Sequence, residues 1–171
     1  MKSQAYISIL IFLLAISCVY RNEEIVNPGV EEYIELLKTN NYDSANLPAF
    51  TYRDIPSLLK YRNEKQIITS FPHNPISSLY APECKLGMYV LWTIESVRAV
   101  SIGSEHLILR FPSQNPILAL RNSDELELIY DDESHEIAAR AYYNWWYNNT
   151  NKSFYDFNNI DPLKETNFQW H

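Results

Sequence analysis

The segment CKLGMYVLWTIESVRAVSI, residues 84–102, constrains the architecture more than any other part of the chain. After Lys85 its charged residues are Glu95 and Arg98 alone, and apolar side chains cover most of its sides. A helix that is hydrophobic nearly all round is a buried one. We therefore expect this segment to form a helix that the rest of the protein covers.

Two similar proline phrases flank this segment, FPHNPI at residues 71–76 and FPSQNPI at residues 111–117. Proline fixes φ and lacks an amide donor, and the residue before it disfavours the helical region. Each phrase is therefore expected to end one helix and direct the chain into the next, without carrying reactive groups. From Phe71 to Phe111 is a step of 40 residues, close to the period of HEAT and armadillo repeats.

Three further helices are expected around these segments. The first covers residues 28–39, with Asn27 as its cap. The second begins at Thr51, whose spacing to Asp54 fits a capping box. The last long helix begins with the acidic residues 131–133, which complement the positive end of a helix dipole.

These elements predict an all-α fold, a small right-handed helical array of HEAT- or armadillo-like helix pairs. Three glycines in 171 residues are too few for the tight turns of a many-stranded sandwich or barrel. An α+β fold with one short hairpin is the alternative. It is favoured by EHLILRF, residues 105–111, and ELELIY, residues 125–130, which alternate as strands do.

The first eighteen residues, MKSQAYISILIFLLAISC, are typical of an export signal, because one lysine precedes an apolar run that ends at a small residue. The apolar run is shorter than the ~20 residues that a membrane-spanning helix needs. The residues before Cys18 resemble a bacterial lipobox, in which the cysteine is acylated after cleavage. An ordinary secretory signal with a coincidental cysteine is the alternative.

This signal predicts the organisation of the chain. We expect residues 1–17 to be a signal peptide, residues 18–29 a lipidated tether and residues 30–171 a single helical domain. The protein would then be exported to the periplasm or the cell surface, and the lipid on Cys18 would hold it to a membrane. We expect a monomer without a cofactor.

Charge narrows the class of partner. The chain has 14 basic and 21 acidic residues, which gives a net charge of −7 at pH 7. Proteins bind nucleic acid by neutralising phosphates with lysine and arginine, and this sequence contains no basic run. The composition therefore argues against a nucleic-acid partner.

No metal site is predicted. The string HEIAA, residues 135–139, begins like the zinc-protease helix motif, in which histidines at i and i+4 face one metal. Ala139 stands where the second histidine should be. The acidic residues before it are explained by the helix dipole.

No catalytic residue is predicted either. Cys84 precedes an apolar run and is expected to be a small buried hydrophobe. His73 lies in the first phrase, but the second phrase contains no histidine, so the pair of phrases is not a duplicated catalytic loop. A small periplasmic hydrolase or processing enzyme that uses His73, His135 or Glu95 is the alternative function.

The carboxyl-terminal thirty residues contain ten aromatic residues interleaved with asparagines. Aromatic rings supply apolar area with a polar edge and are favoured at binding hot spots. The candidate binding residues are Trp145, Trp146, Tyr147 and Trp170. The alternative is that these rings cap the open end of the helical layer, as terminal repeat units must.

Three strings carry a family resemblance: DIPSLLKYRNEKQIITSFPHNPISS, CKLGMYVLWTIESVRA and FPSQNPIL. With them, the chain from about Tyr33 to Trp170 resembles a domain-of-unknown-function family of lipoproteins from gram-negative gut bacteria. The resemblance implies a small exported lipoprotein that is helical and HEAT-like. It assigns no activity and no functional residue. We therefore expect a non-catalytic module that binds a protein or a glycan.

Overall fold

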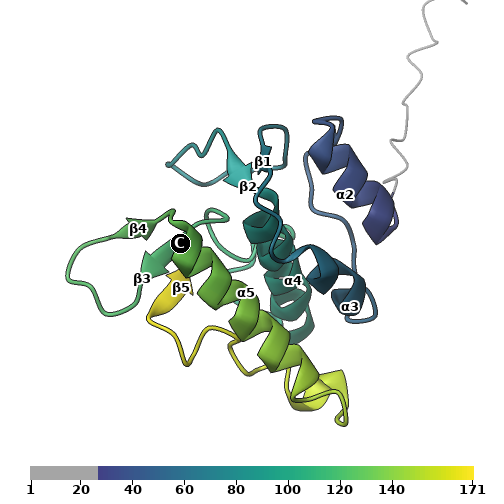
Figure 1. Cartoon of the computed structure of the whole chain (residues 1–171), viewed down its shortest axis with the longest axis vertical. Coiled ribbons are helices and arrows are strands. Elements are labelled where there is room, and N and C mark those ends of the chain that lie inside the picture. Colours follow the sequence, from purple (N-terminus) through teal and green to yellow (C-terminus); the bar gives the residue numbers. More distant parts are fainter. Residues whose placement is uncertain (1–26) are drawn as a thin grey trace, which may run out of the picture.

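The computed structural model describes residues 27–171, so the predicted signal peptide, Cys18 and most of the tether lie outside the described residues. The elements are α2 (Val30–Lys38), α3 (Ile55–Leu58), η1 (Leu59–Tyr61), β1 (Ile67–Ile68), β2 (Cys84–Lys85), α4 (Leu86–Ile102), β3 (Leu118–Leu120), β4 (Leu128–Ile129), α5 (Asp132–Tyr147), η2 (Phe154–Asp156) and β5 (Phe168–Trp170). Figure 1 shows α4 between α5 on one side and α3 with α2 on the other.

Two small sheets accompany the helices. β1 pairs with β2, and β3 lies between β4 and β5, with every pairing antiparallel. The fold is therefore mixed α and β, and the prediction of an all-α, HEAT- or armadillo-like array is wrong. The α+β alternative agrees with the structure, although residues 27–171 contain two sheets where one short hairpin was expected.

The turns of this fold use asparagine at positions that glycine usually takes. Asn122, between β3 and β4, has φ of 65°, and Asn40, after α2, has φ of 55°. Asparagine visits this left-handed region because its short amide can form local hydrogen bonds. The Asn40 Oδ1 atom also accepts hydrogen bonds from the backbone N–H groups of Thr69 and Ser70, at 3.1 and 3.2 Å.

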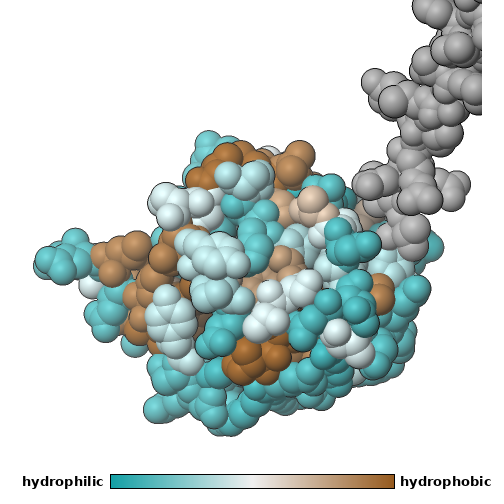
Figure 2. Space-filling model, turned by 90° about the horizontal axis from the view of Figure 1, so that it is seen from above, coloured by the Kyte–Doolittle hydropathy of each residue, from teal (hydrophilic) through white to brown (hydrophobic). Residues whose placement is uncertain are grey.

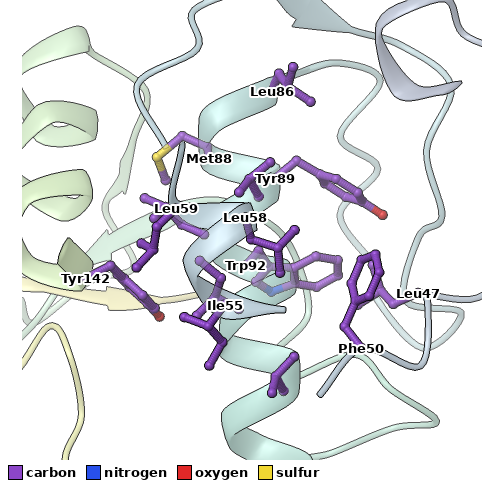
Figure 3. Close-up of a cluster of buried hydrophobic side chains, with 14 of the residues drawn as sticks. Leu47, Phe50, Ile55, Leu58, Leu59, Leu86, Met88, Tyr89, Trp92 and Tyr142 are labelled. Carbon is purple, nitrogen blue, oxygen red and sulfur yellow. The ribbon is translucent and has the colours of Figure 1, made fainter. Parts of the chain in front are cut away.

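The expected buried helix is confirmed as α4, in which 13 of 17 residues are buried. Tyr89 and Trp92 have no exposed surface. Figure 3 shows their rings among apolar side chains from other elements, including Leu47, Phe50, Ile55, Leu58 and Leu59. Gly103 ends the helix with φ of 61°, a conformation that glycine adopts without steric cost.

The two amino-terminal helices form near the predicted positions but differ in their caps. Gly29 is the N-cap of α2, and the predicted cap Asn27 instead accepts a hydrogen bond from the backbone N–H of Ala49 at 2.7 Å. The predicted contact between Thr51 and Asp54 is present, with the Thr51 N–H donating to the Asp54 carboxylate at 2.8 Å. The next helix, α3, is only four residues long and continues into η1.

The last long helix, α5, begins as predicted. The Asp131 carboxylate accepts a hydrogen bond from the backbone N–H of Ser134 at 2.8 Å, which satisfies one of the free donors of the first turn. Ala138 and Tyr142 are fully buried and Trp145 nearly so, and α5 packs against α4. These buried residues lie three or four positions apart and therefore share the face of α5 that packs against α4.

The proline phrases do not turn stacked helices, and that prediction is wrong. They pack on neighbouring turns of α4, where the Phe71 ring lies 4.9 Å from the Tyr89 ring and the Phe111 ring lies 5.5 Å from the Trp92 ring. Because Tyr89 and Trp92 are three residues apart, they lie on one face of the helix. The two phrases consequently lie side by side and contribute to one cleft.

Candidate functional site

We call this hollow the polar cleft; it has a volume of about 580 Å³ and lies where the two phrases meet α4 and β5. The side chains that line it are mostly polar or charged. They include Asn74, Gln114, Glu95, Arg98, Trp170 and His171. The size lies within the range of ordinary ligand sites in proteins, which is roughly 300–1,000 Å³.

Two buried asparagines fix the walls of the polar cleft. Asn74 donates from Nδ2 to the carbonyl of Ser113 at 2.9 Å. In the orientation that satisfies all its neighbours, Asn115 accepts through Oδ1 from the Ser77 hydroxyl at 2.8 Å and from His171 Nδ1 at 3.2 Å. Each asparagine therefore joins its own phrase to residues in or next to the other phrase, and the wall is held without a regular strand pairing.

A buried ion pair lies beneath the cleft. Arg98 donates from Nε to both carboxylate oxygens of Glu95, at 3.1 and 3.0 Å, and from Nη1 to the carbonyl of Asn158 at 3.1 Å. The Tyr142 hydroxyl donates to the Glu95 carboxylate at 2.8 Å, and the Trp170 indole N–H donates to the Tyr142 oxygen at 2.8 Å. This chain of bonds links α4, α5 and β5.

The electrostatics agree with a structural role for this chain. Burial alone would lower the pKa of Arg98, but the bonded Glu95 carboxylate outweighs that effect and raises it. Burial and the neighbouring Glu95 charge hold the pKa of Tyr142 well above its usual value. Tyr142 and Arg98 therefore remain protonated at neutral pH, and the Glu95 carboxylate is engaged by both.

The structure brings one of the four predicted binding residues to the polar cleft, the half-buried Trp170. Trp145 is only 6% exposed and packs in a cluster of rings with Phe154 and Phe157. Trp146 is partly buried against the same cluster. Tyr147 is exposed on α5, beside Tyr143. The carboxyl-terminal rings are thus divided between core and surface.

The residues of the predicted hydrolase alternative lie in different settings. His73 lies against the Tyr80 ring, with a centroid distance of 5.3 Å. His135 binds through Nε2 to the carbonyl of Arg62 at 2.8 Å. Glu95 is held in the ion pair beneath the polar cleft. Within residues 27–171, no hydrogen bond joins any two of these three residues, so they do not form a base, an orienting group and a nucleophile.

Cys84 is buried, as predicted, and its thiol donates a hydrogen bond to the carbonyl of Lys85 at 3.3 Å. Burial raises the pKa of this thiol to about 12, so the reactive thiolate is scarce at neutral pH. In the described part of the chain, no group of three or more histidine, cysteine or acidic residues is placed to hold a metal ion.

Most residues of the polar cleft leave no signal in the sequence. Arg121 and Asp161 lie in its wall and form an ion pair at 2.8 Å, yet they are forty residues apart and no local pattern joins them. The asparagines did leave a signal, because Asn74 and Asn115 hold the same place before proline in both phrases. A polar residue that recurs at the same place in two similar phrases indicates the same structural role in both phrases.

No helix within residues 27–171 has both the length and the apolar character that crossing a bilayer requires.

Comparison with known proteins identifies the family to which this chain belongs. Neither the curated proteins nor the solved structures include a match to this chain. A family model described as Domain of unknown function (DUF4943) matches residues 24–171, which is most of the chain, and the protein therefore belongs to that family.

Proposed function

We propose that this protein is an exported lipoprotein, acylated on Cys18, that binds a neutral glycan in the polar cleft without catalysing a reaction on it. The observation that carries the proposal is the position of Trp170. Its half-buried ring lies in the wall of the cleft among amide, carboxylate and guanidinium groups. An aromatic ring beside such groups suits a sugar, which has an apolar face and hydroxyl edges.

The anchoring of Trp170 favours binding. Its indole N–H is already bonded to the Tyr142 hydroxyl, and β5 pairs with β3 along its length. The ring is therefore held in place before any ligand arrives, which lowers the entropy lost on binding. Gln114 and Gln169, both exposed side chains of the cleft, can donate and accept hydrogen bonds with hydroxyl groups.

The charge of the cleft opposes an anionic ligand. Glu95 pairs with Arg98, and Arg121 pairs with Asp161 at 2.8 Å, so these two cations and two anions of the lining cancel, and the exposed Glu105 adds one further acidic group. A phosphate or a nucleic-acid strand would need unpaired cations. The net charge of −7 for the whole chain also opposes anionic ligands.

The test is a glycan array of neutral oligosaccharides probed with the mature protein, followed by calorimetry on the best ligand. We expect Trp170→Ala to weaken binding about tenfold or more, as loss of an aromatic anchor does. Gln114→Ala should weaken it about fivefold, the effect of one lost hydrogen bond. Because the Gln114 side chain is exposed, its loss should leave the fold intact. Tyr155→Ala, an exposed ring outside the cleft, is the matched control.

Two results would overturn the glycan assignment. One is the absence of any saturable glycan binding by the native protein. The other is binding that neither Trp170→Ala nor Gln114→Ala weakens. Lipid attachment is tested separately, by labelling gram-negative cells that express the chain with an alkyne fatty acid. The label should enter the native protein and be lost in Cys18→Ala, and a labelled variant would refute acylation at this residue.

A further inference from the structure

A second hollow, which we call the apolar cleft, lies between the β1–β2 hairpin, the β3–β4 pair and the start of α5. Its volume is about 330 Å³, at the small end of ligand sites. Met88, Ile117 and Leu118 are buried side chains that line it. It shares no lining residue with the polar cleft, although the second proline phrase contributes to both.

The mouth of the apolar cleft carries large hydrophobic side chains that remain exposed. Ile67, Tyr80 and Tyr130 are 46%, 73% and 63% exposed, and all three line the cleft. They come from distant parts of the chain. Figure 2 shows the face that lies at the top of Figure 1, near β1 and β2, with hydrophobic patches between hydrophilic ones. Apolar side chains gathered around a hollow indicate a binding site more strongly than scattered ones do.

The charges around this cleft do not cancel. Lys85 binds Asp132 at 2.5 Å, and Lys65 binds Asp132 and Glu136, each at 3.0 Å. These two cations and two anions neutralise one another. Two further acidic residues that line the cleft, Glu83 and Asp131, form no ion pair within residues 27–171, which leaves a net charge of −2 for these six residues.

His135 provides an independent sign of a missing donor. A carbonyl oxygen only accepts hydrogen bonds, so the contact with Arg62 fixes the proton of the neutral ring on Nε2. Burial lowers the pKa of His135 and so favours that neutral form. Nδ1 is then an acceptor, and it is buried without a partner in the described part of the chain. Buried acceptors of this kind are rare.

The ring of His135 is also held rigidly. It lies against Gly87 of α4, where a β-carbon would stand 2.6 Å from His135 Nε2 and 2.5 Å from the Arg62 carbonyl oxygen. A residue that is 2% exposed and packed in this way cannot turn Nδ1 toward another partner. The wall of the cleft therefore keeps an acceptor in place.

We propose that the apolar cleft binds a small amphipathic amine, which has an apolar body and one ammonium group. The apolar lining takes the body, and the tyrosine rings at the mouth attract the cation through their faces. Glu83 and Asp131 supply the complementary charge. An ammonium group also brings three donors to a cleft whose wall includes His135, the residue with the unpaired Nδ1 acceptor. This site is independent of glycan binding.

The experiment compares three probes of similar shape by calorimetry on the mature protein: 2-phenylethylamine, 2-phenylethanol and 3-phenylpropionate. We expect the amine to bind one-to-one, about fivefold more tightly than the alcohol and more tightly still than the carboxylate. The advantage of the amine should shrink as salt is added, because ions screen exposed charges.

Three variants locate the site. Glu83→Gln should weaken amine binding severalfold and leave alcohol binding unchanged, since it removes charge but keeps shape. Tyr80→Ala should weaken both, and Tyr155→Ala, a similarly exposed ring elsewhere, should weaken neither. The proposal is overturned if the amine shows no saturable binding, if amine and alcohol bind equally, or if Glu83→Gln and Tyr80→Ala leave amine binding unchanged. The results expected for the amine do not depend on whether the polar cleft binds a glycan.

Discussion

The two proline phrases begin alike and end differently. Phe71 and Phe111 both lie against rings of α4, and Asn74 and Asn115 are both buried. The isoleucines that close the phrases diverge, because Ile76 is 63% exposed while its counterpart in the second phrase is 7% exposed. The shared residues are those that attach a phrase to the helix and to its neighbour, so similar sequence here encodes similar anchoring.

The segments after the two phrases account for this divergence. After the second phrase the chain enters β3, which has β4 on one side and β5 on the other. Ile117 directly precedes β3, its side chain is nearly buried, and its carbonyl accepts a hydrogen bond from the His171 N–H at 3.0 Å. After the first phrase the chain continues as an irregular loop to β2, and nothing in the described chain covers Ile76. Burial at the last position is thus set by distant partners and not by the phrase itself.

Replacing the phenylalanine rings that contact α4 should have the largest effect on stability. Replacing the fully buried Phe111 by alanine should lower the free energy of unfolding by about 3–5 kcal/mol, the usual cost of such a cavity. Phe71→Ala should cost somewhat less, because Phe71 is 6% exposed. Urea denaturation followed by tryptophan fluorescence measures both. A larger loss for Phe71→Ala would show that the first phrase is the main anchor.

The isoleucines that close the two phrases should differ most in their contribution to stability. Ile117→Ala should cost about 2–4 kcal/mol, because the side chain is nearly buried. Ile76→Ala should change stability by no more than about 0.5 kcal/mol, as exposed substitutions usually do. The same denaturation experiment applies. Equal losses would mean that Ile76 has a covering partner in solution.

The asparagines should give the next largest effect. Asn115→Ala removes the partner of the Ser77 hydroxyl and of His171 Nδ1, and should cost about 2 kcal/mol, within the range for unsatisfied buried groups. Asn74 binds the Ser113 carbonyl and the Ile76 N–H, and its loss should cost about 1 kcal/mol. If Asn74→Ala proved the more damaging, the pairing of the phrases would depend on the first asparagine.

The smallest expected effect is on the pH dependence of the unfolding free energy. Burial lowers the pKa of His73 in the folded protein, so between the two pKa values the unfolded chain binds more protons. Stability from the neutral ring is complete above about pH 6.5 and declines as the pH falls through that value toward the folded pKa. His73→Ser, which copies Ser113 of the second phrase, should flatten the dependence of unfolding free energy on pH between about 5 and 7. His135 and His171, whose pKa values are also lowered, should preserve part of it. An unchanged slope would contradict this account of His73.

The sequence predicted the elements whose signal is local. α4 followed from its apolar surface, and α5 followed from its acidic start. The sheets could be predicted only in part. The alternating residues 125–130 contain β4, but the other strands have two or three residues, and no alternation can be recognised over so few positions. The contact between the two phrases could not be predicted either, because it depends on the docking of both phrases on α4.

The candidate site shows the same limit. Composition identified an aromatic carboxyl-terminal region, and Trp170 does line the polar cleft. Composition could not show that Trp145 faces the core, because the two tryptophans differ in their tertiary neighbours and not in their own chemistry. The apolar cleft gave no sequence signal, as its lining comes from four separate segments.

The contact between Gly87 and His135 has an evolutionary consequence. A methyl group at position 87 would meet the Arg62 carbonyl and the imidazole at once, whereas a methyl group at Gly29 would meet nothing within 4 Å. Of these two glycines, position 29 is therefore free to vary, while position 87 should remain glycine wherever α4 and α5 approach so closely. An exchange at position 87 would push α4 away from both groups, and a smaller residue in place of His135 would relieve only one of the two clashes, because the Arg62 carbonyl belongs to the backbone.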